Sequence, residues 1–300
     1  MTDTIGFIGL GNMGGRMARR LVESGREVLG FDVRPGLAAS VGARAADSVG
    51  EVAGQCDVLL LSLPDSRIIE QVVGGEDGVL AHARAGQVVV DLSTASPAST
   101  RLLGTRLAAK ETGYLDAGIS GGAAAADKGA LTLMVGGDPD ALERVRPVLD
   151  VFSARIFHCG VSGTGHTAKV LNNFLNAVAL ASTAEVMVAG KKAGLDLAVL
   201  LDILNASSGV NFATLNRFPK IINGDYLEGG LSNALMMKDV TLYTDLAAAL
   251  GVATLNASGP LASFGLANGL GYADRISNTV VDAIGDVSGG VRLHSEGGQA

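Results

Sequence analysis

The first half of the chain alternates short apolar runs with longer amphipathic stretches. The apolar runs are rich in β-branched residues and several lack polar alternation, which is typical of strands buried on both faces of a parallel sheet. Between the first two runs, Met13, Met17, Leu21 and Val22 share one helical face, so that strand, helix and strand form a βαβ unit. The pattern predicts strands over residues 4–9, 27–32, 58–63, 87–91, 113–117, 130–136 and 155–158.

From Gly163 onward the pattern is helical and no further strand-like run occurs. The change predicts an N-terminal Rossmann-type domain over residues 1–162, with a doubly wound, mostly parallel α/β sheet. An all-α domain for substrate binding and oligomerisation is expected over residues 163–300, with a flexible tail from about Gly285. The predicted helices cover residues 164–192, 196–205, 211–222, 233–250, 260–268 and 274–284.

Composition and charge exclude several classes of protein. Of the 300 residues, 48% are hydrophobic and 18% charged, which is enough to bury a large core and excludes a mainly disordered chain. The formal net charge of −7 argues against a nucleic-acid partner, as does the lack of any basic run longer than two residues. Cys56 and Cys159 lie 159 − 56 = 103 positions apart and form no redox or metal motif, which favours a reducing compartment.

The remaining composition signals concern membranes, metals and assembly. The most apolar stretch, residues 177–190, is interrupted by Glu185 and is shorter than the roughly 20 residues that cross a bilayer. The chain opens without the pattern of a secretory signal, so we expect a cytoplasmic protein without a membrane association. No His, Asp and Glu cluster has metal-ligand spacing, so no metal is expected. The apolar, Ala-rich helices of the second half predict a homodimer or homotetramer.

A dinucleotide-binding motif follows the first predicted strand. Its G-x-G-x-x-G pattern provides a tight turn and a close backbone approach to a pyrophosphate, and it opens a helix whose N-terminus favours phosphate. Asp32 ends the second predicted strand, 32 − 9 = 23 residues after the first glycine, where an acid would bind the adenosine ribose hydroxyls. Asp32 favours NAD, but Arg34 could bind the extra phosphate of NADP, so both cofactors stay open. The residues of the motif are Gly9, Leu10, Gly11, Asn12, Met13 and Gly14.

A second glycine-rich segment, Gly118-Ile119-Ser120-Gly121-Gly122, allows several interpretations. It spells the G-x-S-x-G of a serine hydrolase, with Ser120 as nucleophile. The phosphate-binding motif on the first strand argues against that chemistry, for which it has no use. Alternatively, the Ser120 hydroxyl and the N–H groups of Gly121 and Gly122 could bind a substrate carboxylate; a purely structural turn also stays open. The histidines that could serve a hydrolase as base are His158, His166 and His294.

Lys169 is a charged residue in an apolar, Ala-rich predicted helix at the expected domain junction, where clefts form. Asn173 follows at i+4, so that both side chains lie on one side of the helix. Burial and the nearby helix N-terminus both disfavour the ammonium form, which would let Lys169 exchange a proton near neutral pH. A lysine that carries the proton beside a cofactor that carries the hydride would interconvert an alcohol and a carbonyl. His166 could compete as a base, but it is more typical of a polar helix start.

These motifs resemble those of the β-hydroxyacid dehydrogenase family, whose members include 3-hydroxyisobutyrate dehydrogenase and tartronate semialdehyde reductase. The resemblance covers about residues 4–285 and includes the cofactor motif described above. The family's D-A-P-V-S-G-G motif and its G-x-L-T-x-M-V-G-G stretch are similar to residues 116–122 and 129–137. Its G-x-x-G-x-G-x-x-x-K-x-x-x-N motif is matched in full by residues 160–173. Gly118 stands where the family has proline, and Ala124 where glycine is common.

The resemblance implies roles for individual residues. Lys169 is the implied catalytic residue, and Lys238, in a K-D motif, would close over the cofactor and the substrate. The implied substrate contacts are Ser120, Gly121, Gly122, Asn173 and Lys238. The implied cofactor contacts outside the glycine motif are Asp32, Leu63, Pro64, Thr94 and Lys238.

The expected function is therefore that of an NAD(P)-dependent oxidoreductase acting on a small carboxylate. The substrate would be a 3-hydroxy acid or its semialdehyde, most like that of 3-hydroxyisobutyrate dehydrogenase, with a tartronate or other semialdehyde reductase as the alternative. Asn172 stands where 6-phosphogluconate dehydrogenases have histidine, which argues against a sugar-phosphate substrate. Imine reductases usually lack the lysine that stands at Lys169. A non-catalytic dinucleotide-binding scaffold and the serine hydrolase are the distant alternatives.

Overall fold

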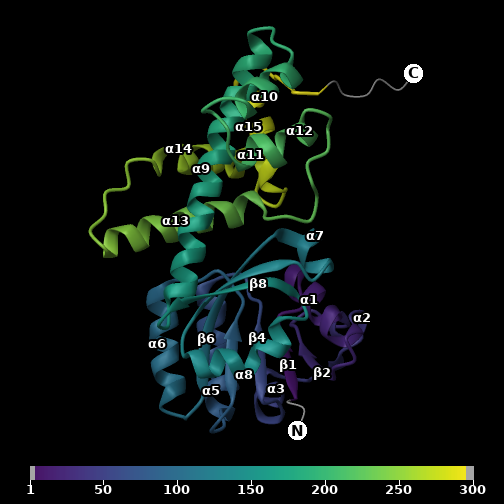
Figure 1. Cartoon of the computed structure of the whole chain (residues 1–300), viewed down its shortest axis with the longest axis vertical. Helices are drawn as coiled ribbons and strands as arrows, with labels where there is room; N and C mark the ends of the chain where they lie inside the picture. The colour runs from purple at the N-terminus through teal and green to yellow at the C-terminus, as the bar shows by residue number, and fades with distance from the viewer. Residues whose placement is uncertain (1–3, 295–300) are drawn as a thin grey trace. The chain divides into compact units, whose positions relative to one another are not determined.

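The computed structural model of the protein describes residues 4–294. The chain divides into two compact units, residues 1–170 and residues 171–300 (Figure 1). The division lies within α9 (Thr164–Lys192), whereas the boundary expected from the sequence, after residue 162, lies just before this helix. Among the described residues, no helix combines the length and the apolar character that a membrane crossing would need.

A single mixed sheet of eight strands forms the centre of the first unit, in the order β3-β2-β1-β4-β5-β6-β7-β8. The first six strands are parallel to one another; β7 runs antiparallel to β6 and parallel to β8. The predicted Rossmann-type, mostly parallel sheet is confirmed. The strands are β1 (Ile5–Ile8), β2 (Val28–Phe31), β3 (Arg44–Ala45), β4 (Val58–Leu61), β5 (Val88–Asp91), β6 (Gly113–Ser120), β7 (Leu131–Gly136) and β8 (Ser153–Gly160).

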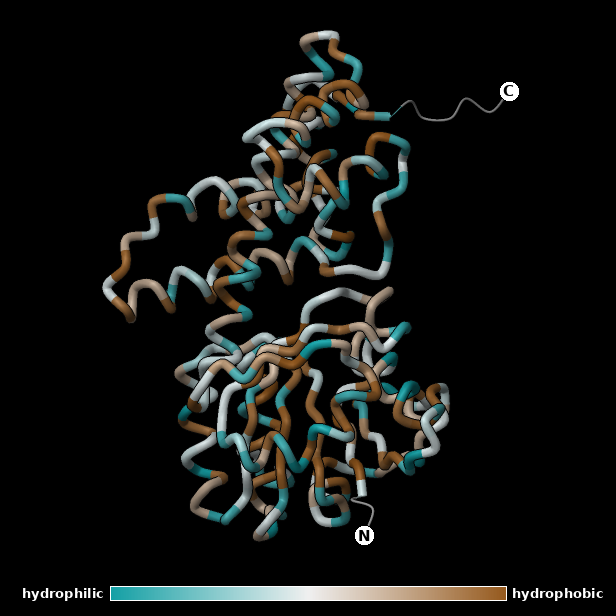
Figure 2. The backbone as a smooth tube through the Cα atoms, in the orientation of Figure 1, coloured by the Kyte–Doolittle hydropathy of each residue, from teal (hydrophilic) through white to brown (hydrophobic). Residues whose placement is uncertain are grey.

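Helices cover both faces of this sheet because alternate strand residues point to opposite sides. Phe7 and Leu60 pack on one side with α1, α2, α7 and α8, while Ile8 and Leu61 pack on the other side with α3, α4, α5 and α6. Figure 2 shows the hydrophobic colour along these strands. The helices are α1 (Asn12–Glu23), α2 (Leu37–Ser40), α3 (Val49–Gln55), α4 (Ser66–Gly74), α5 (Val79–His82), α6 (Pro97–Ala108), α7 (Gly122–Asp127) and α8 (Pro139–Leu149).

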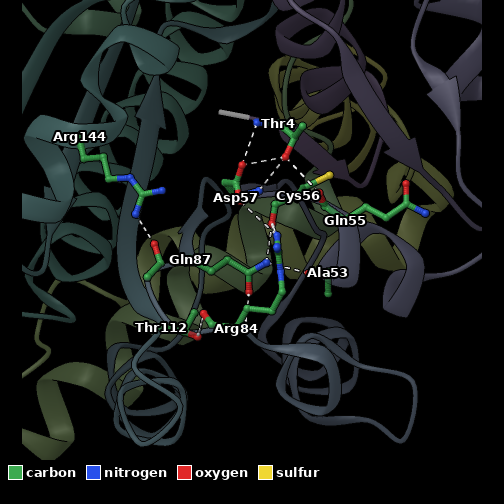
Figure 3. Close-up of polar contacts among 10 residues, drawn as sticks. Thr4, Ala53, Gln55, Cys56, Asp57, Arg84, Gln87, Thr112 and Arg144 are labelled. Atoms are coloured by element: carbon green, nitrogen blue, oxygen red, sulfur yellow. Dashed lines mark hydrogen bonds and ion pairs between the residues drawn. The ribbon is translucent and has the colours of Figure 1, made fainter. Parts of the chain in front are cut away.

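Polar side chains link the amino ends of the parallel strands (Figure 3). The Asp57 carboxylate accepts hydrogen bonds from the Thr4 backbone N–H and hydroxyl, at 3.2 and 3.0 Å, and pairs with Arg84 at 3.3 Å. The Gln87 side-chain amide donates to the carbonyls of Ala53 and Cys56 at 2.8 and 2.7 Å. These contacts tie β1, β4 and β5 together at the edge opposite to the glycine motif.

The second unit is helical, and its described residues form no strand beyond an isolated bridge between Ser232 and Ile276. Its core contains Phe174, Phe218, Met236 and Phe264. The predicted all-α second half is thus confirmed for the described residues. Besides most of α9, its helices are α10 (Leu197–Asn205), α11 (Phe212–Asn216), α12 (Phe218–Ile221), α13 (Asn233–Ala249), α14 (Ser258–Ala267), a π-turn (Asn268–Tyr272), a 3₁₀ turn (Ser277–Thr279) and α15 (Val280–Val287).

Two predictions for this unit are wrong in detail. The single helix expected over residues 211–222 is two short helices, since Arg217 has a φ of −113° between them and Pro219 follows in the first turn of α12. The flexible tail expected from Gly285 is ordered as far as residue 294, because α15 continues to Val287 and Leu293 is buried in the core. The rest of the predicted tail, residues 295–300, lies outside the described residues.

Candidate active site

The glycine motif forms a turn between β1 and α1 that only glycine can make. Gly9 has a φ of +89°, and a Cβ there would lie 2.3 Å from the Ser62 carbonyl oxygen. A Cβ on Gly14 would lie 1.9 Å from the Gly9 carbonyl oxygen. The backbone of Gly11 is the N-cap of α1 and offers no side-chain cap. A helix start that is tightly turned and has no side-chain cap fits a dinucleotide pyrophosphate. The pyrophosphate would accept hydrogen bonds from the N–H groups of the first helical turn.

Asp32 lies beside this turn, where the ribose of a dinucleotide would bind. Its carboxylate accepts hydrogen bonds from the backbone N–H groups of Leu10, at 2.8 Å, and of Arg34, at 2.9 Å. Burial works against its charge, but these N–H groups and the Arg34 guanidinium outweigh it and lower the pKa of Asp32. Arg34 also reaches the turn, since a Cβ on Gly11 would lie 3.2 Å from its guanidinium. Both residues that bear on the choice between NAD and NADP therefore face the glycine motif.

Two further predicted cofactor segments follow β4 and β5 at the same edge of the sheet. The Ser93 hydroxyl accepts a hydrogen bond from the Leu63 N–H at 2.9 Å, which joins the loop of Leu63 and Pro64 to the loop of Ser93 and Thr94. The Asp91 carboxylate, which is fully buried, accepts from the Ser93 N–H at 3.1 Å and from the Tyr114 hydroxyl at 2.9 Å. Burial and this carboxylate raise the pKa of Tyr114, which remains a hydrogen-bond donor.

Ser120 lies at the end of β6, which is three residues longer than the sequence predicted because Gly118, Ile119 and Ser120 pair with β7. Gly118 is thus a strand residue, not part of a loop. Gly121 and Gly122 follow with φ values of +127° and +70°, and α7 begins at Gly122.

The far end of α7 is tied to the cofactor-binding helix. Asp127, its last residue, forms an ion pair with Arg16 of α1. Arg16 in turn donates a hydrogen bond to the Asn12 side chain at 3.3 Å. The predicted substrate segment and the predicted phosphate-binding segment are therefore joined through these three side chains.

Lys169 lies in the second turn of α9, directly against β6. Its side chain is 9% exposed, and a Cβ on Gly118 would lie 2.4 Å from its Cβ and 2.9 Å from its Cγ. The stem of the lysine therefore runs over the strand that ends at Ser120. Lys169 is therefore buried and is not a surface lysine.

The start of α9 is held by buried polar groups. The Asp116 carboxylate accepts hydrogen bonds from the N–H groups of Gly163, at 2.7 Å, and His166, at 2.8 Å. The His166 ring is fully buried and donates from Nε2 to the Asp91 carbonyl, at 3.2 Å, because a carbonyl can only accept. Its Nδ1 is hydrogen-bonded to the Thr100 hydroxyl at 2.7 Å, and that hydroxyl also lies 3.0 Å from the Ser96 carbonyl oxygen. With both nitrogens engaged, His166 has a structural place and is a poor candidate for the base.

In the second unit, two predicted site residues meet at Asp239. The Asn173 side-chain amide donates a hydrogen bond to its carboxylate, and Lys238 Nζ lies 3.1 Å from the other carboxylate oxygen. Asp239 is 1% exposed and Asn173 is 5% exposed. Because α9 continues without a break through Lys169 and Asn173, these side chains lie one turn apart on one side of the helix.

The described residues give little support to a serine hydrolase. His158 donates from Nε2 to the Gly137 carbonyl at 2.9 Å, and His166 is engaged as described above. Furthermore, β6 pairs with an antiparallel strand at Ser120, whereas a nucleophile elbow follows a central parallel strand. Among residues 4–294, three or more His, Cys, Asp and Glu side chains do not come together in a group that could hold a metal ion.

Three buried carboxylates, Asp91, Asp116 and Asp239, have roles that the sequence did not identify, although Asp116 and Asp239 lie in the motifs noted above. The signal was present in part, since an acidic residue within or next to an apolar run must find partners when it is buried. What the sequence does not show is which groups those partners are, because the hydrogen-bond partners of Asp116 lie 47 and 50 residues away.

Both halves of the chain match known families of proteins. Residues 4–160 match the family model described as the NAD binding domain of 6-phosphogluconate dehydrogenase. Residues 163–277 match the one described as NAD-binding of NADP-dependent 3-hydroxyisobutyrate dehydrogenase.

Similar curated proteins and solved structures cover most of the chain. The NAD-dependent L-serine dehydrogenase of Pseudomonas aeruginosa is 40% identical over 284 residues, which are 90% of this chain and 94% of that protein. The 2-(hydroxymethyl)glutarate dehydrogenase of Eubacterium barkeri is 39% identical over 241 residues, covering 79% and 80%. The structure of Mycobacterium tuberculosis 3-hydroxyisobutyrate dehydrogenase with L-serine has a TM-score of 0.85 at 34% identity and covers 95% of this chain and 99% of that one.

Proposed function

The chain belongs to the β-hydroxyacid dehydrogenase family and is an NAD(P)-dependent oxidoreductase, and we propose that it oxidises 3-hydroxypropanoates that carry a substituent at C2. L-serine, 3-hydroxyisobutyrate and 2-(hydroxymethyl)glutarate, the compounds named for its relatives, share this skeleton: a CH₂OH group next to the carbon that bears the carboxylate. They differ only in the C2 substituent, which is an ammonium, a methyl or a carboxyethyl group. Reduction of the corresponding semialdehydes is the reverse reaction.

The proposal depends above all on the place of Lys169. Its side chain is nearly buried against β6, the strand that ends at Ser120. The cofactor, when bound, exchanges hydride with the carbon that bears the oxygen. Lys169 Nζ would take the hydroxyl proton during oxidation and return it during reduction. Ser120, Gly121, Gly122 and Asn173 would hold the carboxylate end of the substrate.

The cofactor would bind along the carboxyl edge of the first unit. The glycine motif would hold the pyrophosphate, Asp32 the adenosine ribose, and the loops of Leu63–Pro64 and Thr94 would line the nicotinamide half. Lys238 would contact both cofactor and substrate. Asp32 favours NAD over NADP, because a carboxylate repels a 2′-phosphate.

Turnover with a panel of acids tests this function. NADH and NADPH formation are followed with 3-hydroxyisobutyrate, L-serine, 2-(hydroxymethyl)glutarate, glycerate and 4-hydroxybutyrate. We expect turnover of one or more of the first three and none of 4-hydroxybutyrate, whose hydroxyl lies one carbon further from the carboxylate. Glycerate, the reduced form of tartronate semialdehyde, has the same skeleton with a hydroxyl group at C2, so a kcat/KM that is highest for glycerate would indicate the alternative, a tartronate semialdehyde reductase. Cofactor binding without turnover of any acid would instead support a non-catalytic scaffold.

Replacing the lysine tests its role. We expect Lys169→Ala to lower kcat by about 10²–10⁴-fold, the usual contribution of general acid–base catalysis, while NADH binding measured by fluorescence stays close to that of the wild type. Lys128→Ala, which removes an exposed lysine of the same unit, is the matched control. Near-normal turnover of Lys169→Ala would exclude the lysine as the proton carrier.

We propose in addition that the protein is a cytoplasmic homodimer or homotetramer. Leu171 and Leu175 on α9 are 46% and 68% exposed, and Val199 and Ile203 on α10 are 54% and 57% exposed. These pairs at i and i+4 form apolar stripes that association with a second copy would cover. Both cysteines are free thiols, in keeping with a reducing compartment. Light scattering during gel filtration gives the mass of the assembly; a mass near 30.3 kDa would show a monomer.

A further inference from the structure

We infer that Asp116 and Gly118 of β6 are positioning residues that together fix where Lys169 lies. The inference rests on the proposed function, in which Lys169 carries the proton. Residues 116, 118 and 120 alternate along β6 and so share one face of the sheet. This face meets the first two turns of α9, as the contacts of Asp116 and Gly118 show.

Asp116 fixes the start of the helix. Its carboxylate is fully buried and uses one oxygen for the Gly163 N–H, at 2.7 Å, and the other for the His166 N–H, at 2.8 Å. Hydrogen bonds to a charged acceptor are the strong ones, and a carboxylate is favoured at a helix N-terminus. His166 precedes Lys169 by three residues, so both belong to one side of the same helix. A shift at Asp116 would therefore move the lysine.

Close backbone packing at Gly165 leaves the helix start no room to move toward the sheet. A Cβ on Gly165 would lie 2.4 Å from the carbonyl oxygens of Asp116 and Met134. The helix therefore rests on the backbones of β6 and β7 with no side chain between them. The Asp116 hydrogen bonds then set the position of the helix along the strand.

Gly118 fixes the lysine stem itself. A Cβ at this position would lie 2.4, 2.9 and 3.4 Å from Cβ, Cγ and Cδ of Lys169, and the first two contacts are shorter than side chains tolerate. The stem thus occupies the space that a side chain at position 118 would fill.

Alanine substitutions at Gly118 and, as a control, at Gly113 test the contact between Gly118 and the lysine stem. In Gly118→Ala the new Cβ pushes the lysine stem away from the strand, and we expect kcat to fall by about tenfold or more, since an error of about 1 Å in a catalytic group can cost about 10²-fold. The KM for the cofactor should stay within about twofold, because the glycine motif is untouched. Gly113→Ala is the matched control: its Cβ would meet Val88 and Ala141 at 3.5 and 3.6 Å, which are ordinary contacts.

Asparagine substitutions at Asp116 and, as a control, at Asp196 test the hydrogen bonds that Asp116 accepts at the start of α9. Asp116→Asn turns one acceptor into a donor that faces a backbone N–H, and we again expect a fall in kcat with little change in the KM for the cofactor. Asp196 caps α10 in the same way, accepting from the N–H groups of Ala198 and Val199. Because Oδ1 alone accepts both of these bonds, Asp196→Asn keeps the cap and should lower neither the melting temperature nor kcat.

The reactivity of Lys169 separates this inference from the proposed function. Trinitrobenzenesulfonate labelling of Lys169, quantified by peptide mass spectrometry, requires no turnover. Labelling several-fold faster in Gly118→Ala and Asp116→Asn than in the wild type, with Gly113→Ala and Asp196→Asn unchanged, would support the inference. Unchanged labelling and kcat in both variants would overturn it. A wild type that oxidises none of the acids would contradict the proposed function, and labelling would still decide whether β6 positions the lysine. If one variant does not fold, the other decides alone.

Discussion

At the residue scale, Asp32 is the residue that we propose favours NAD over NADP. We expect Asp32→Ser to lower the ratio of kcat/KM for NAD to that for NADP by about tenfold, because about 1.4 kcal/mol of charge repulsion corresponds to that factor. The change also releases Arg34, which pairs with Asp32 at 3.3 Å, to bind the 2′-phosphate. Initial rates with both cofactors measure the ratio. Arg34→Ala should move the ratio the other way, and an unchanged ratio in Asp32→Ser would mean that its carboxylate does not face the ribose.

Asp239 is a second residue whose replacement should change substrate binding more than stability. It is buried, accepts a hydrogen bond from Asn173 and pairs with Lys238. It therefore holds both side chains in fixed positions. Asp239→Asn keeps its shape but removes its charge. We expect the KM for the hydroxy acid to rise by about tenfold, in line with the loss of a hydrogen bond to a charged group, while the melting temperature changes by only a few degrees. Asp245→Asn, further along α13, is the control. A KM equal to that of the wild type would show that Asp239 does not position Asn173.

At the element scale, the turn into α1 is the part of the fold proposed to bind the pyrophosphate of the cofactor. A Cβ on Gly14 would meet the Gly9 carbonyl oxygen at 1.9 Å, so Gly14→Ala must displace either the turn or the helix. Such overpacking costs about 1–3 kcal/mol. We expect weaker NADH binding by tenfold or so and a lower melting temperature. Gly54→Ala in α3, where a Cβ would meet nothing within 4 Å, should change neither. Wild-type NADH affinity in Gly14→Ala would show that the turn tolerates a side chain.

Long elements with a strong apolar pattern were predictable from the sequence. The helix predicted over residues 164–192 has these same bounds as α9, and each predicted strand corresponds to an observed one. Periodicity works for such elements because each buries many side chains on a consistent face. The two-residue strand β3, both residues of which are exposed, has no apolar pattern and was missed.

The arrangement around Lys169 was only partly predictable. The spacing of the glycines, Lys169 and Asn173 identified these candidate site residues, because the motif is made of residues close together in the sequence. The hydrogen bonds that Asp116 accepts from the start of α9 and the contact between Gly118 and the lysine stem join segments about 50 residues apart. Such contacts follow from the register of β6 against α9, which the sequence alone does not determine.

At the scale of the whole molecule, the buried and bridged carboxylates make stability depend on pH. Burial disfavours the charge of Asp32 and of Asp57, but the backbone N–H groups of Arg34 and Thr4 outweigh it and lower the pKa of each. A group whose folded pKa lies below its unfolded value of about 3.9 contributes stability that is complete above that value and is lost as the pH falls through the folded pKa. Asp282 affects stability in the opposite direction. Burial raises its pKa in the folded state, so its contribution to stability is lost as the pH rises and not as it falls.

The lowered groups tie the strands together at the sheet's two edges, so acid should loosen the first unit. We expect the urea midpoint of the protein to fall as the pH is lowered from about 5 to 3. In Asp57→Asn the group no longer titrates, and its bonds to Thr4 are weakened at every pH, so the midpoint at pH 7 should be lower and its decline toward pH 3 shallower. Asp47→Asn, an exposed position of the same unit, should follow the wild type. A decline in Asp57→Asn as steep as that of the wild type would mean that the amino-edge contacts of Asp57 do not carry the acid sensitivity.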